Sequence, residues 1–197
     1  MYHDHSDMRM YTDLVDLNRS FLGLLTEPGA GRAAPGLGLD VVIVEQLRRL
    51  SPDEIEFIAA TPGLLACFAW LPQANLLQVA EIPAARPPFP SEWRESARLY
   101  VTGVLTWLWH LDQHGWPCCA LCAGFDEKVP GLPGEFDFAR ILTSADFAVD
   151  RLRARFTDHP SFWADLIRSA RSGDEELRAL SQLTVIPLVL AEECSAR

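Results

Sequence analysis

The stretch "SEWRESARLYVTGVLTWLWHLDQHG", residues 91–115, carries the pattern that decides the fold class. Apolar side chains recur in it at three- and four-residue steps, as they do on one face of an amphipathic α-helix. That face consists of Trp93, Ala97, Tyr100, Val104, Leu108 and Leu111. Ser91 is suited to the start of a helix and Gly115 to its end. We therefore predict one long helix, which buries this face.

Shorter helical patterns lie on both sides of the long helix. Their expected starts are at residue 10 and at Asp40, Ser51, Ser144, Pro160 and Asp174. The start at Ser51 is the clearest, because Pro52 occupies the first helical position and Glu54 completes a capping box. No alternating run is long enough to build a sheet. The sequence predicts an all-α protein with an orthogonal or irregular bundle in two helical halves.

Segments rich in glycine and proline interrupt the helical patterns. "EPGAGRAAPGLG", residues 27–38, predicts a loop. Four prolines fall within residues 82–90, which predicts a linker. We expect a helical domain over 1–81, this linker, and a second helical domain over 91–197. The apolar run "LLACFAW", residues 64–70, fits either a strand or a buried helical turn.

Charge and composition limit the classes of function. The net charge is −10, and Lys128 is the single lysine. Stand-alone DNA binding is therefore not expected, because affinity for nucleic acid comes mainly from cations that neutralise phosphates. There are five cysteines, an odd number, and three of them lie within residues 118–122. This number and spacing fit reduced thiols better than a disulfide framework. With neither a secretory signal nor a run of about 20 apolar residues, we expect a cytoplasmic protein that is not membrane-bound.

One cluster of residues could carry chemistry. His110 and His114 share a helix face, and Cys119 and Cys122 form a C-x2-C pair after it. Four such nitrogen and sulfur ligands could hold zinc, or the two thiols could act as a redox pair. The remaining interpretation is that the cysteines pack as small apolar side chains beside tryptophans. No nucleophile–base–acid set is apparent, so we expect neither an enzyme nor a bound cofactor or metal.

The first third of the chain resembles the FlhD family, the D subunit of the flagellar master transcriptional activator. The resemblance rests on "DLNRSFLGLL" (16–25) and "GLGLDVVIVEQLRRLSPDEIEFIAATPGLLACF" (36–68). The matching positions are Asp16, Leu17, Asn18, Ser20, Leu37, Gly38, Leu39, Leu50, Ser51, Ile58, Ala59, Leu64 and Phe68. The chain departs from the family at residues 28–36, which replace a helical stretch, and at residues 90–197, which have no counterpart. Cys67 lies one position from the family's cysteine, so no intersubunit disulfide is carried over.

The resemblance implies an all-α homo-oligomer that regulates transcription through a partner subunit and contacts DNA only indirectly. We predict that the chain associates through the apolar face of its first helix and through two later residues. These residues are Leu14, Leu17, Phe21, Leu25, Leu47 and Phe68. Such a stripe also fits an intramolecular core. The alternative functions are a metal- or thiol-dependent enzyme or sensor at His110, His114, Cys119 and Cys122, and an acidic chaperone-like accessory protein.

Overall fold

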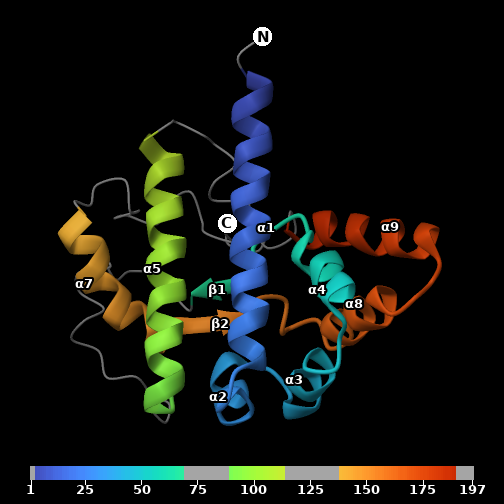
Figure 1. Cartoon of the computed structure of the whole chain (residues 1–197), viewed down its shortest axis with the longest axis horizontal. Coiled ribbons are helices and arrows are strands. Elements are labelled where there is room, and N and C mark those ends of the chain that lie inside the picture. Colours follow the sequence, from blue (N-terminus) through green and yellow to red (C-terminus); the bar gives the residue numbers. More distant parts are fainter. Residues whose placement is uncertain (1–2, 69–88, 114–137, 190–197) are drawn as a thin grey trace.

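The computed structural model describes residues 3–68, 89–113 and 138–189 (Figure 1). Its helices are α1 (His3–Thr26), α2 (Ala30–Leu37), α3 (Val41–Leu47), α4 (Pro52–Ala59), α5 (Ser91–Gln113), α7 (Phe138–Ala148), α8 (Phe162–Ala170) and α9 (Glu175–Leu183). The strands β1 (Ala66–Phe68) and β2 (Leu152–Ala154) pair antiparallel, and the short helix η3 (Val149–Arg151) precedes β2. Helices dominate, so the prediction of an all-α fold is confirmed.

The two longest helices, α1 and α5, lie side by side and form the centre of the molecule (Figure 1). The ring of Phe21 on α1 lies 5.4 Å from that of Tyr100 on α5. The indole N–H of Trp93 donates a hydrogen bond of 3.0 Å to the carbonyl of Leu24. Helix α7 packs against α5, whereas α4, α8 and α9 lie on the opposite side of α1. Buried side chains from before and after the proline-rich segment form one hydrophobic core.

Local chemistry accounts for the helix starts that the sequence predicts. The Ser51 hydroxyl accepts from the Glu54 N–H, while the Glu54 carboxylate accepts from the Ser51 N–H, which completes the capping box of α4. Asp40 caps α3 and Asp174 caps α9 through their carboxylates. Helix α5 includes Ser91, and all six apolar residues selected for its buried face are buried. The helix starts at Asp40, Ser51 and Asp174 and the buried face of α5 are confirmed, whereas the end of that helix expected at Gly115 lies outside the described residues.

The prediction of a loop over residues 27–38 is wrong, because α2 occupies most of this segment. Glycine supports both ends of the helix: Gly29 and Gly38 have φ values of 92° and 82°, in the left-handed region. Between them, small apolar side chains at helical spacing face the core. The buried residues are Ala30, Ala33, Ala34 and Leu37. Their burial outweighs the signals of glycine and proline, and Pro35 lies in the last turn.

The prediction that a helix starts at Ser144 is also wrong. Ser144 lies inside α7 and is buried, and the chain beyond η3 extends into β2 instead of continuing as a helix. Cys67 of β1 is the register partner of Arg153 of β2. The open choice for "LLACFAW" is thereby resolved as a strand over residues 66–68. Most of the predicted linker lies outside the described residues, and the division into two domains stays a prediction.

One buried polar side chain fixes α1 to the segment between α4 and β1. Asn18 is fully buried, and its Nδ2 donates to the carbonyls of Ala59 and Gly63 at 3.1 and 3.0 Å. A third carbonyl, that of Thr61, lies 3.3 Å from the same nitrogen. The N–H of Leu65 donates to Asn18 Oδ1 at 2.8 Å. Asn18 thus satisfies several backbone groups that would otherwise be buried without a partner.

Candidate functional site

The predicted metal or thiol site is only partly visible. His110 is exposed near the end of α5, whereas His114, Cys119 and Cys122 lie outside the described residues. Within residues 3–68, 89–113 and 138–189, no group of three or more His, Cys, Asp or Glu side chains is placed to hold a metal ion. The hypothesis of an enzyme or sensor built on these four residues therefore stays a prediction.

Five of the six residues predicted for association belong to the core of this chain, and the sixth packs against it. Leu17 is half-buried and packs against that core. The other five, Leu14, Phe21, Leu25, Leu47 and Phe68, are buried within it. Their side chains leave little area for a second chain, so association through them would require the core to open. An interface made of these residues stays a prediction.

Helix α9 exposes an apolar surface that the sequence reasoning missed. Four side chains spaced three residues apart, which we call the apolar row, face solvent on α9 and on the helical turn that follows it. They are Leu177, Leu180, Leu183 and Ile186, with 45%, 53%, 58% and 42% of their surface exposed. No residue of α9 itself is buried. Side chains three residues apart are neighbours on a helix surface, so these half-exposed aliphatic side chains follow one another along the helix instead of lying scattered, as apolar residues do on an ordinary surface.

The side of α9 that faces the rest of the chain is polar. Gln182 donates through Nε2 to the carbonyl of Phe57 on α4 at 2.7 Å. The guanidinium carbon of Arg178 lies 4.5 Å from the centroid of the Phe57 ring. Arg178 Nε and Gln182 Oε1 are buried without a hydrogen-bond partner in the described part of the chain. A surface helix normally turns its apolar face inward, and α9 does the reverse.

Local sequence explains why α9 begins at this point of the chain. The Asp174 carboxylate accepts from the N–H groups of Glu176 and Leu177, at 2.9 and 3.2 Å. Glu175 and Glu176 add negative charge in the first turn, where the helix dipole favours it. At the far end, Val185 is 1% exposed and anchors the following helical turn in the core. The helix is thus held by its cap and its end, with its leucines left outside.

The same charges give the apolar row an acidic border. Asp174, Glu175 and Glu176 are all exposed at the N-terminal end of α9. Arg178, the cation of α9, lies over the Phe57 ring on the inner side of the helix. Any chain that covers the row therefore meets carboxylates at this end. In the sequence, leucine spacing marks an amphipathic helix but does not show which face lies inward.

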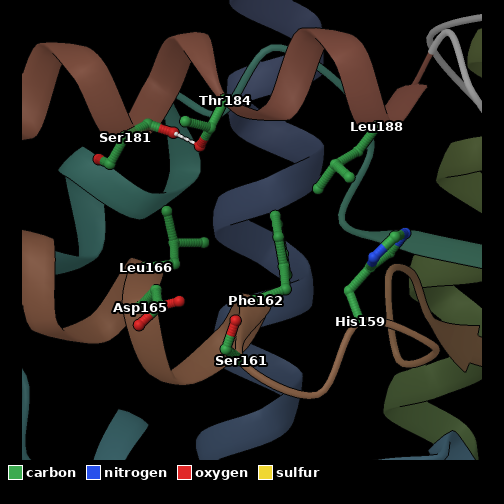
Figure 2. A pocket seen from close by; sticks show the side chains of 8 residues that line it. All are labelled: His159, Ser161, Phe162, Asp165, Leu166, Ser181, Thr184 and Leu188. Carbon is green, nitrogen blue, oxygen red and sulfur yellow. Dashed lines mark hydrogen bonds between the residues drawn. The ribbon is translucent and has the colours of Figure 1, made fainter.

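A pocket of about 310 Å³ lies between α8 and α9, beneath this helix (Figure 2). Its lining residues are His159, Ser161, Phe162, Asp165, Leu166, Ser181, Thr184 and Leu188. Figure 2 shows His159 and Asp165 on opposite sides of Phe162. Asp165 accepts a hydrogen bond of 2.6 Å from Arg168, and Thr184 donates one of 2.7 Å to the carbonyl of Ser181. These eight side chains do not form a nucleophile–base–acid arrangement.

Within the described ranges, no helix has both the length and the apolar character that crossing a membrane requires. Comparison of the chain with protein-family models, with curated proteins and with solved structures finds no match. The resemblance to the FlhD family therefore stays a prediction, and the function has to be argued from the molecule itself.

Proposed function

We propose that this chain is a protein-interaction subunit, and that another polypeptide docks on the apolar row of α9. The observation that carries the proposal is the reversed placement of α9. Its Arg178 and Gln182 face the chain, while its leucines face solvent. Exposed contiguous apolar patches of this kind mark interaction sites.

The energy available at the row is sufficient for docking. Burial of a whole leucine-sized side chain contributes about 1.5–3 kcal/mol. Each member of the row has roughly half of its surface exposed. Covering all four therefore contributes on the order of 3–6 kcal/mol before the costs of association are subtracted. Further contacts at the border of the row would add to this binding energy.

Within this proposal, the chain regulates transcription through a partner subunit in the cytoplasm, as the resemblance to FlhD implies. The net charge of −10 supports an indirect role at DNA, since such a surface is repelled by phosphates. Homo-oligomerisation, which the resemblance also implies, is a separate part of the proposal, because the residues selected for it are largely in the core. Light scattering at micromolar concentration tests this part, and a strict monomer would contradict it.

Site-specific photocrosslinking in the cells that produce the protein tests the docking face. A photoreactive amino acid replaces Leu183 in one variant and Leu99 in a control, because Leu99 is the most exposed leucine on α5, at 63%. We expect a crosslinked polypeptide from position 183 and none from position 99. Equal crosslinking at both positions, or none at either, would overturn the proposal. A partner unrelated to transcription, identified by mass spectrometry, would remove only the regulatory role.

A further inference from the structure

We infer that the occupant of the apolar row is an amphipathic helix of a different protein, with an aliphatic face and flanking Lys or Arg residues. This inference rests on the proposed function and specifies the partner's chemistry. Three observations support it: the dimensions of the row, the acidic residues at its end, and the charge of the whole chain.

The dimensions fit a single helix. The row extends from Leu177 to Ile186, and nine steps of 1.5 Å span about 14 Å, or two and a half helical turns. Helices that dock into apolar surfaces use anchors at i, i+3 or i+4, and i+7, which span about 11 Å, so the row is long enough to receive one such set of anchors. The exposed parts of four aliphatic side chains lie well below the roughly 800 Å² per partner of a stable interface between whole proteins. The apolar row therefore fits a single docked helix better than the broad surface of a folded partner protein.

The charges select a basic segment over a second copy of this chain. Asp174, Glu175 and Glu176 are exposed where the row begins. Two copies that paired through α9 would each bring these carboxylates to the same contact, and such repulsion opposes this pairing, whereas the net charge of −10 attracts a basic segment. A helix with Lys or Arg beside its aliphatic face meets opposite charge and gains both attraction and orientation. Arg178 does not reverse this preference, because its guanidinium lies over Phe57 on the inner side of α9.

Three fluorescent 18-residue peptides test the inference against the full chain. The first is an amphipathic helix of leucine and lysine, the second has glutamate in place of lysine, and the third is a scrambled leucine–lysine sequence without an apolar face. Binding is measured by fluorescence anisotropy at low and high salt. We expect the helical leucine–lysine peptide to bind most tightly, and its affinity to fall as salt rises, because screening weakens the charge contribution.

Variants of α9 locate the binding site. We expect Leu183→Asp to weaken binding roughly tenfold or more, as loss of a central apolar anchor does. The matched control Leu99→Asp, on α5, leaves the affinity unchanged. The double variant Glu175→Gln/Glu176→Gln keeps the Asp174 cap and is expected to weaken binding up to about fivefold, as removal of exposed charge pairs does. Circular dichroism verifies that each variant is folded, and Leu180→Gln replaces Leu183→Asp if that variant is not.

The outcomes separate this inference from the proposed function. Equal binding of the leucine–glutamate peptide, with sensitivity to Leu183→Asp, would overturn the basic partner but keep α9 as a docking face. Equal binding of the scrambled peptide, or no loss with either α9 variant, would show nonspecific attraction and overturn both. If sedimentation shows a dimer that Leu183→Asp converts to monomers, the second copy is the occupant and the inference is wrong. Absence of binding by every peptide would also overturn it.

Discussion

Replacement of Asn18 by leucine should destabilise the fold far more than an ordinary single substitution. Leucine has a similar shape but cannot donate to the carbonyls of Ala59 and Gly63 or accept from the N–H of Leu65. These three backbone groups would remain buried, because the site is closed to solvent. Each unsatisfied group costs about 1–3 kcal/mol, which the added apolar burial offsets only in part. We expect a loss of about 3–5 kcal/mol in the free energy of unfolding.

Urea denaturation followed by far-UV circular dichroism measures this loss, and thermal unfolding should show a decrease in Tm of about 10 °C. The matched control is Ser20→Ala, two residues along the same helix. Its exposed hydroxyl donates to the carbonyl of Asp16, one turn earlier in the same helix, so a change within about 0.5 kcal/mol is expected. If Asn18→Leu lies within about 1 kcal/mol of the wild type, Asn18 does not hold α1 to the segment before β1 and the reasoning fails.

Two further predictions concern α4. Ser51→Ala removes one half of the capping box and should lower the free energy of unfolding by about 1 kcal/mol, whereas Ser51→Thr should preserve most of it; equal losses in urea melts would contradict the cap. The Arg19 guanidinium, hydrogen-bonded to Glu56, holds the pKa of that carboxyl below its usual 4.5. A lowered pKa in the folded state stabilises at neutral pH, and this contribution is lost as the pH falls through that pKa. The wild type should therefore have a higher free energy of unfolding than Glu56→Gln, and this difference should be larger at pH 7 than at about pH 3. An equal difference at both pH values would refute the assignment.

Helix starts were predictable because their chemistry is local. Ser51 and Asp174 act on N–H groups two or three residues away, so a short stretch of sequence contains the whole interaction. Strand β2 was not predictable in this way. It has three residues, and it exists because Cys67 meets Arg153 across a long separation in the chain. Helix α2 was missed for a related reason, since burial of its alanines depends on distant parts of the core.

The candidate site was missed because orientation is a tertiary property. The spacing of Leu177, Leu180 and Leu183 marks one face of a helix, and amphipathic patterns ordinarily predict that such a face lies inward. The contacts of Arg178 and Gln182 with Phe57 reverse this orientation. Phe57 is more than a hundred residues away in sequence, so no local pattern contains the information. The residues selected instead on the first helix proved to be parts of the core or to pack against it.

The most direct test of the central claim is the free energy of unfolding of the double variant Leu180→Gln/Leu183→Gln, measured in urea beside Val185→Ala. If the apolar row faces solvent, the double variant should stay within about 1 kcal/mol of the wild type, since exposed substitutions change stability little. Val185 is 1% exposed, and its truncation should cost roughly 2 kcal/mol. A loss in the double variant as large as that of Val185→Ala would show that the leucines pack against their own chain and would contradict the account.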